Sequence, residues 1–154
     1  MRCRSAAMMR GYWRDPERTA EAIDADRWLH TGDLGFVGAD GNLRIVGRLK
    51  EMYIRGGYNV YPAEVEAVLA EHPSVARAAV VGAPDPVLGE VGVAFVVPAP
   101  GSAPPTRDAL RSWCRDRLAD YKAPDRIEVI DDLPLTSLHK IDKRALVARV
   151  TEGK

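Results

Sequence analysis

The chain has 154 residues, 46% of them hydrophobic, and its 22 basic side chains (Lys and Arg) balance 22 acidic ones (Asp and Glu). Zero net charge argues against nucleic acid or an anionic membrane surface as partner, because both select a basic face. The two cysteines, Cys3 and Cys114, exclude a disulfide framework and a four-thiolate metal site. No apolar run approaches the roughly 20 residues of a membrane-spanning helix. We therefore expect a cytoplasmic protein without a membrane span.

The first part of the chain predicts a short helix followed by a β-hairpin. Asp15-Pro16-Glu17 is typical of a helix start, because Asp caps free backbone N–H groups and Pro suits the first turn. We expect this helix to end near Ile23. Leu34 to Val37 and Leu43 to Val46 are short apolar strands, and an Asp-Gly pair between them favours a turn. We expect this β-rich piece to have no core of its own.

From about residue 51 the pattern changes to that of a small α+β domain. Met52 to Arg55 is predicted to be a strand that ends at Gly56-Gly57. Residues 75–82 and 91–97 are β-branched runs, which we expect to pair as sheet strands across a loop at 84–89.

Three helices and one more strand complete this domain. The helices are expected from Tyr61-Pro62 onward, from Thr106 to about Ala119, and from Asp142 to Val150, and the strand at 126–130. Cys114 falls on the buried side of the second helix, so we interpret it as a core side chain rather than a reactive thiol. The predicted fold class is α+β: a small mixed sheet with packed helices, preceded by a short β-rich tail.

Four short motifs follow one another along the chain. They are Trp28-Leu29-His30-Thr31-Gly32-Asp33-Leu34-Gly35, Gly47-Arg48-Leu49-Lys50-Glu51, Arg55-Gly56-Gly57-Tyr58-Asn59-Val60-Tyr61-Pro62-Ala63-Glu64-Val65-Glu66, and Leu133-Pro134-Leu135-Thr136 followed by Lys140-Ile141-Asp142-Lys143. In this order and spacing they resemble the carboxyl-terminal part of the adenylate-forming family, which comprises acyl-CoA synthetases, peptide-synthetase adenylation domains and firefly-type luciferases. The resemblance runs from about Met9 to Leu146.

The resemblance implies a division into two parts. Residues 1–49 would be the end segment of a large amino-terminal adenylation domain, and residues 50–154 the carboxyl-terminal lid domain. In the family, the large domain holds the phosphate loop, the acid pocket and the groups for adenine and magnesium. We therefore expect this chain to be inactive alone and to need the missing domain as its partner, in cis or in trans.

Asp33 and Arg48 are the candidate nucleotide contacts. An aspartate after a glycine turn can set two carboxylate oxygens against two vicinal hydroxyls. The resemblance implies that Asp33 holds the ATP ribose and that Arg48 offers its guanidinium to ribose or phosphate oxygens. The alternatives are an Asx-type turn cap for Asp33 and an ordinary surface position for Arg48.

The next motifs concern domain movement and coenzyme A. Lys50 stands where the family keeps the hinge between its two domains. Gly56 and Gly57 lack a Cβ, and the resemblance makes them one wall of the channel for the coenzyme A thiol, with Tyr58 beside it. The alternative is a structural bulge between strand and helix. The run from Gly57 to Glu64 is similar to acyl-CoA ligases, which favours coenzyme A over a carrier protein.

Lys140 is the candidate catalytic residue. A mobile ammonium can bridge the substrate carboxylate and the ATP α-phosphate as charge builds in the transition state, and the family uses such a lysine for adenylation. The family usually has Thr-Pro-x-Gly-Lys, whereas this chain has Thr136-Ser137-Leu138-His139-Lys140. The family glycine suggests a positive φ, which His139 tolerates poorly.

The expected function is the carboxyl-terminal portion of an ATP-dependent acyl-CoA synthetase. ATP, AMP and coenzyme A would be substrates of the full enzyme, and Mg²⁺ would enter through ATP only. His30 and His72 have no carboxylate or cysteine at ligand spacing, so we assign no metal to protein side chains. Two alternatives stay open: a stand-alone or remnant module that docks on a partner's adenylation domain, and the lid of an enzyme that loads a carrier protein.

Overall fold

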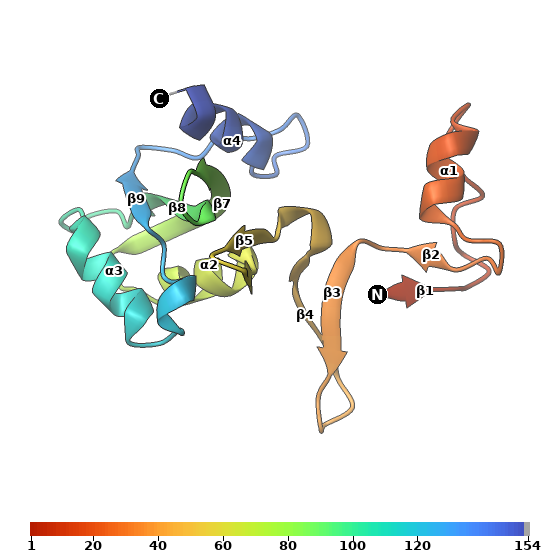
Figure 1. The fold of residues 1–154 in the computed structure, drawn as a ribbon, viewed down its shortest axis with the longest axis horizontal. Helices are drawn as coiled ribbons and strands as arrows, with labels where there is room; N and C mark the ends of the chain where they lie inside the picture. Colours follow the sequence, from red (N-terminus) through yellow and green to blue (C-terminus); the bar gives the residue numbers. More distant parts are fainter. Residues whose placement is uncertain (153–154) are drawn as a thin grey trace. The chain divides into compact units, whose positions relative to one another are not determined.

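The computed structural model describes residues 1–152, and the chain forms two compact units, Met1–Lys50 and Glu51–Lys154. Among the described residues, no helix is both long and apolar enough to cross a lipid bilayer. The predicted α+β class is confirmed (Figure 1). The elements, in chain order, are β1 (Arg2–Cys3), α1 (Pro16–Ala22), β2 (Leu29–His30), β3 (Asp33–Val37), β4 (Leu43–Arg48), the 3₁₀ turn η1 (Leu49–Glu51), β5 (Tyr53–Arg55), β6 (Tyr58–Val60), α2 (Pro62–Ala70), β7 (Val75–Asp85), β8 (Gly89–Pro98), α3 (Arg107–Arg115), the 3₁₀ turn η2 (Asp120–Lys122), β9 (Arg126–Val129) and α4 (Lys143–Glu152).

The first unit contains α1 and two small antiparallel strand pairs, β1 with β2 and β3 with β4. The Asp15 carboxylate accepts the Arg18 N–H at 3.0 Å, which is the predicted cap of α1. Within this unit, all of which the structure describes, Ile23 is the one buried hydrophobic side chain. As predicted, the unit has no core of its own.

The β3–β4 hairpin is the part of this unit that positions candidate site residues. Its turn closes through Gly38, whose N–H donates to the Asn42 carbonyl at 2.9 Å, and Gly41 has a φ of +77°. The register places Asp33 directly opposite Arg48. Two residues that are far apart along the chain thus become cross-strand neighbours.

The second unit is built on a five-stranded sheet with the order β6-β5-β8-β7, in which β9 also pairs with β8. The β8–β9 pairing is parallel and the others are antiparallel, so the sheet is mixed as predicted. The two predicted long strands do pair, but β7 runs on to Asp85 and β8 starts at Gly89. Hence only residues 86–88 form a loop, which the Asp85 carboxylate closes by accepting the N–H groups of Val87 and Leu88, each at 2.9 Å.

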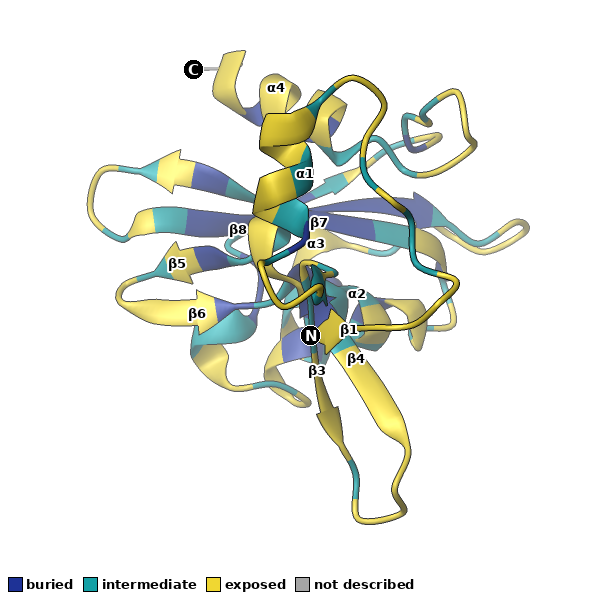
Figure 2. Cartoon of the chain, turned by 90° about the vertical axis from the view of Figure 1, so that its right-hand side faces the viewer, coloured by how far each residue is buried: buried dark blue, intermediate teal, exposed yellow. Residues whose placement is uncertain are grey.

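Helices cover both faces of this sheet. On one face α2 and α3 pack against side chains of β7, β8 and β9, and on the other face α4 packs against the alternate residues of β7 and β8 (Figures 1 and 2). Because neither face meets water, the run Val91–Val97 is buried without interruption (Figure 2). The two core clusters centre on Val65, Leu69, Val80, Val96, Leu110 and Cys114, and on Ala79, Val81, Phe95, Leu146 and Val150.

Helix α3 is shorter than predicted, because it ends at Arg115 instead of near Ala119. The N–H groups of Arg117 and Leu118 both turn back to the Cys114 carbonyl, and Ala119 is extended with a ψ of 142°. The start is as predicted, with the Thr106 hydroxyl accepting the Ala109 N–H at 3.2 Å. Cys114 is fully buried and burial raises the pKa of its thiol to about 11, which confirms it as a core side chain.

Candidate functional site

Asp33 and Arg48 lie together at the base of the β3–β4 hairpin. Arg48 Nε is 3.1 Å from Asp33 Oδ1, and the Arg48 side chain is 65% exposed whereas that of Asp33 is 20% exposed. The Thr31 hydroxyl accepts the Asp33 N–H at 3.1 Å, and Gly32 supplies the preceding turn with a φ of +75°. No hydrogen bond from residues 1–152 reaches the second carboxylate oxygen, Oδ2. Within residues 1–152, the pair thus presents one acceptor oxygen without a partner beside an exposed guanidinium.

Lys50 is the last residue of the first unit and lies in the short 3₁₀ turn η1. Its side chain is exposed. The Leu49 N–H donates to the Gly32 carbonyl at 2.8 Å, which ties the chain just before Lys50 to the loop that precedes Asp33. Our expectation of a hinge at Lys50 requires only that the backbone can rotate there, and the side chain itself has no assigned chemistry.

The glycine pair is a hairpin turn and not a bulge between strand and helix, which was the alternative that the sequence left open. A strand that the sequence analysis missed, β6, pairs with β5 directly across Gly56-Gly57. The two glycines have φ values of +55° and +87°, as the two central residues of a tight hairpin turn require. Both are exposed, and a Cβ built on Gly57 would meet nothing within 4 Å. The turn conformation therefore demands glycine, and the space outside it is open.

Tyr58 begins the strand that follows this turn. Its ring stacks on Tyr121 of η2, with ring centroids 4.6 Å apart and an angle of 24° between the ring planes. The residue is 58% exposed, so much of its surface faces solvent. The turn and the stacked tyrosines together form an open ledge on the second unit.

Lys140 ends a tight loop whose backbone is hydrogen-bonded to itself. The Thr136 N–H donates to the Lys140 carbonyl at 2.7 Å, the His139 N–H donates to the Thr136 carbonyl at 2.9 Å, and Leu135 bridges to Ile141 below it. Lys140 is exposed, and no side chain among residues 1–152 pairs with its ammonium group. His139 has a φ of +57°, which confirms the positive φ that the sequence predicts before the lysine.

Replacing His139 with glycine is expected to raise the free energy of unfolding by about 0.5–1 kcal/mol. A residue with a Cβ pays roughly 1–2 kcal/mol in the left-handed region, and the greater freedom of glycine in the unfolded chain offsets part of that gain. Urea denaturation of the purified chain measures the change. His139→Ala is the matched control, because it keeps the Cβ and should not raise the free energy of unfolding. Equal stabilisation by both variants would contradict backbone strain at residue 139.

His30 corrects another expectation, because it does have a carboxylate neighbour. Its Nε2 lies 3.0 Å from Asp24 Oδ2, and Arg2 lies 3.8 Å from the same oxygen. The hydrogen bond from the Trp28 N–H lowers the pKa of Asp24, and His30 lowers it further. One carboxylate and one imidazole do not make a metal site, and residues 1–152 contain no group of three or more possible ligands.

Comparison with known proteins gives the family. Residues 64–140, half of the chain, match the family model of the AMP-binding enzyme C-terminal domain, and Lys140 is the last residue matched. The chain belongs to this family. The AMP-binding enzyme C-terminal domain thus accounts for α2, β7, β8, α3 and β9, together with the loop that carries Lys140.

This chain is similar to parts of longer proteins. It is 52% identical over 143 residues (93% of this chain, 28% of the relative) to 3-[(3aS,4S,7aS)-7a-methyl-1,5-dioxo-octahydro-1H-inden-4-yl]propanoyl:CoA ligase of Mycobacterium tuberculosis. It is 52% identical over 136 residues (88% and 27%) to feruloyl-CoA synthase of an Amycolatopsis species. The chain therefore spans less than a third of these relatives and corresponds to the carboxyl-terminal portion of acyl-CoA-synthetase-like adenylate-forming enzymes.

Solved structures agree with this assignment. An amide bond synthetase from Marinactinospora thermotolerans superposes with a TM-score of 0.91 at 45% identity, over 97% of this chain and 30% of that one. The o-succinylbenzoate CoA synthetase of Bacillus subtilis, solved with its acyl-adenylate intermediate, gives a TM-score of 0.86 at 36% identity, over 94% and 29%.

One cluster in the second unit was not expected from the sequence. The Lys143 ammonium lies 2.6 Å from Glu51 Oε2 and 2.7 Å from Glu66 Oε1, and Glu66 Oε1 also accepts the Val80 N–H at 2.8 Å. The cluster ties the residue after Lys50 to the start of α4, three residues beyond Lys140. The only signal in the sequence was the repeated lysine of the Lys-Ile-Asp-Lys motif, which gives no partner.

Replacing Lys143 with methionine is expected to lower the free energy of unfolding by about 2 kcal/mol. Two carboxylates would then face each other without their cation, and removing one partner of a fully buried pair costs about 3–5 kcal/mol. We expect less because Lys143 is 22% exposed and its partners 22–34% exposed. Urea denaturation measures the change, and Arg144→Met, which removes an exposed cation of the same helix, is the matched control. Equal losses of stability in the two variants would contradict a stabilising role of the cluster.

Proposed function

We propose that this chain is the carboxyl-terminal part of an acyl-CoA synthetase that makes acyl-CoA from a carboxylic acid, ATP and coenzyme A. In the first step a carboxylate oxygen attacks the α-phosphorus of ATP and pyrophosphate leaves. In the second step the coenzyme A thiol attacks the acyl carbon, the thiol loses its proton and AMP leaves. The main support is that Lys140 and the Gly56-Gly57 turn are both exposed, on separate loops of one unit.

In the first step three side chains of this chain would act on the nucleotide and the acid. The Lys140 ammonium is free to bridge the acid carboxylate and the α-phosphate, where negative charge grows in the transition state. Asp33 would accept the ribose hydroxyls through its free Oδ2, with Arg48 beside it on ribose or phosphate oxygens. Mg²⁺ would enter with the ATP phosphates, and we assign it no protein ligand.

In the second step the other loop would take over. Rotation of the backbone at Lys50 would withdraw Lys140 and bring Gly56 and Gly57 to the entering thiol. The open space outside Gly57 supports this, because a narrow pantetheine chain can approach bare backbone closely. Tyr58, held by its stack on Tyr121, would line the channel. One lid could thus serve two different transition states in turn.

The exposed apolar side chains of the first unit support the proposal that a large domain is missing from this chain. It exposes large apolar side chains that a unit without its own core cannot bury: Tyr12, Trp13, Phe36, Val37, Leu43 and Ile45, with Trp13 86% exposed. We propose that residues 1–49 are the end segment of the amino-terminal adenylation domain and that the rest of that domain covers these side chains. Residues 50–154 would then be the lid.

The decisive experiment is ATP–pyrophosphate exchange with the purified chain. We expect no exchange from the chain alone, since the acid pocket and the phosphate loop would lie on the large domain. Adding or fusing the large domain of a related ligase should restore exchange with the acid of that ligase. Robust exchange by the 154-residue chain alone would overturn this allocation of parts.

A carrier protein is the second candidate for the thiol acceptor. The chain is 49% identical over 140 residues, 91% of its length, to a fatty acid–[acyl-carrier-protein] ligase of Streptomyces coeruleorubidus, of which it covers 27%. Free coenzyme A and a carrier protein with its pantetheine arm, compared as acceptors in the reconstituted enzyme, distinguish the two. Faster transfer to coenzyme A supports our proposal.

A further inference from the structure

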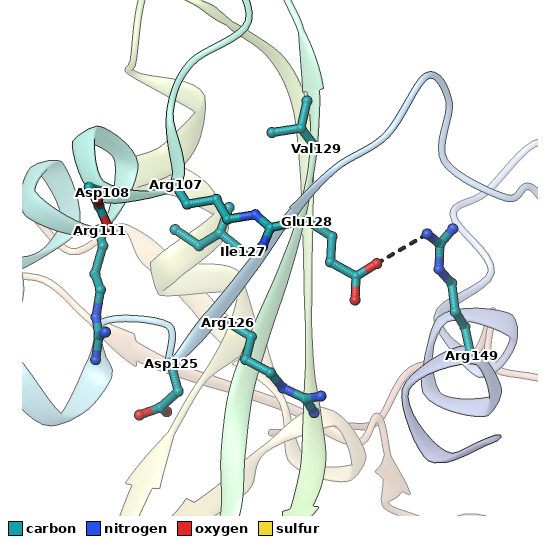
Figure 3. A pocket seen from close by; sticks show the side chains of 9 residues that line it. All are labelled: Arg107, Asp108, Arg111, Asp125, Arg126, Ile127, Glu128, Val129 and Arg149. Atoms are coloured by element: carbon teal, nitrogen blue, oxygen red, sulfur yellow. Dashed lines mark ion pairs between the residues drawn. The ribbon is translucent and has the colours of Figure 1, made fainter. Parts of the chain in front are cut away.

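A polar hollow of about 430 Å³ lies in the second unit, and none of the candidate site residues described above lines it (Figure 3). It follows β9, with α3 on one side and α4 on the other. Figure 3 shows the Arg149 guanidinium facing the Glu128 carboxylate, with the side chain of Arg107 reaching in from the α3 side and that of Arg126 extending from β9. The full lining is Arg107, Asp108, Arg111, Asp125, Arg126, Ile127, Glu128, Val129 and Arg149.

Positive charge is in excess in this hollow. Arg149 lies 3.1 Å from Glu128, so that pair is neutral, and the Asp125 carboxylate is bound by Arg55 at 2.7 and 2.9 Å. The side chains of Arg107 and Arg126 have no ion pair or hydrogen bond to any of the residues that the structure describes. Two guanidinium groups are therefore left uncompensated beside a hollow.

A further donor in the same wall also lacks an acceptor. The Nε–H of Arg111 is shielded from solvent yet has no hydrogen-bond partner within residues 1–152. Arg111 extends along the α3 side of the hollow, apart from Glu128 (Figure 3). The positive charge of Arg111 is offset by the carboxylate of Asp108, which has no partner within residues 1–152.

We propose that the hollow binds a phosphate monoester, with Arg107 and Arg126 as its main ligands. A phosphate monoester carries close to two negative charges at neutral pH, which matches the two unpaired guanidinium groups. Its oxygens suit the two-pronged donor geometry of arginine. The volume leaves room for more than the phosphate itself, as small-molecule sites do. The ester could come from a free phosphorylated metabolite or from the 3′-phosphate of coenzyme A. The inference rests on the proposed function only if coenzyme A is the source.

NMR titration of the ¹⁵N-labelled chain at pH 8 tests the proposal, with inorganic phosphate, coenzyme A and 3′-dephospho-coenzyme A as probes. We expect phosphate to shift the amide signals of Arg107 and of residues 126–128. The Arg107→Gln/Arg126→Gln variant should bind at least tenfold more weakly. Glu128→Gln should bind several-fold more tightly, because it removes the competing carboxylate and releases Arg149.

Arg144→Gln is the matched control, since it removes an exposed arginine of α4 outside the hollow. It should bind like the unaltered chain, and unchanged amide spectra far from the hollow show that each variant is folded. Tight binding of coenzyme A that 3′-dephospho-coenzyme A lacks supports the coenzyme source. Binding of phosphate but not of coenzyme A supports a free metabolite. Unshifted hollow amides with both probes, or equal affinity of the double variant, overturns the site without bearing on the adenylation proposal.

Discussion

Lys140→Ala in the enzyme reconstituted with a large domain is expected to lower the rate of adenylation by about 10²–10³-fold. The ammonium would act on charge that exists only in the transition state, and loss of one such donor costs about 3–4 kcal/mol. The fall should appear in the maximal rate of ATP–pyrophosphate exchange more than in the apparent KM values. Stopped-flow or steady-state exchange assays measure both.

The second half-reaction provides the internal control for Lys140. Transfer of the acyl group from preformed acyl-adenylate to coenzyme A should continue nearly unchanged in Lys140→Ala, because the lysine would then be withdrawn. Lys140→Arg should recover only part of the adenylation rate, since its planar group does not reproduce a compact ammonium. Arg144→Ala should leave both steps alone. Equal losses in both half-reactions would refute the separate roles of the two loops.

Gly92→Ala is expected to lower the free energy of unfolding of the second unit by about 3 kcal/mol. A Cβ at this position would lie 2.3 Å from the Tyr53 hydroxyl oxygen and 3.1 Å from Cζ of the ring. The ring has no room to retreat, because Tyr53 is 1% exposed and also packs against Gly82, the register partner of Gly92, where an added Cβ would lie 2.6 Å from Cβ of Tyr53 and 3.1 Å from Cγ of its ring. Overpacking of this kind costs about 1–3 kcal/mol, sometimes more.

The Tyr53 hydroxyl makes this prediction testable by a double-mutant cycle. It is buried and has no hydrogen-bond partner among residues 1–152, and burial raises the pKa of Tyr53, with the nearby Asp125 carboxylate raising it further. Tyr53→Phe removes an unpaired buried group, so alone it should be neutral or slightly stabilising. In the Tyr53→Phe background, Gly92→Ala should cost at least about 1 kcal/mol less. Additive effects in urea denaturation would show that the clash is not with the hydroxyl.

Local signals explain which elements were predicted well. The caps at Asp15 and Thr106 are hydrogen bonds between residues three apart, so the sequence contains both partners. The missed strand β6 is only three residues long, and its conformation depends on pairing with β5. Without that pairing nothing separates it from the approach to a helix, so the sequence did not show that Gly56-Gly57 is a hairpin turn.

The candidate site divides in the same way. The resemblance alone supplied Lys140, Asp33 and the glycine pair, and the positive φ at His139 was expected because the family has a glycine at this position. Neither the Lys143 cluster nor the arginine hollow could be found, since each gathers residues from several elements. Lys143 and Glu51 are 92 residues apart, and only the packing of α4 against the sheet brings them within 2.6 Å.

By itself the sequence determined the family, the alternation of helices and strands, and which lysine, aspartate and glycines to examine. These follow from motif order, cap chemistry and hydrophobic period, all of which are local along the chain. The tertiary structure alone decided that the glycines form a hairpin turn, that Lys140 stands exposed on a closed loop, and that two arginines without a side-chain partner among residues 1–152 line a hollow beside β9. Charge pairing and solvent exposure depend on which side chains come close in space, and these neighbours are fixed only when the chain has folded.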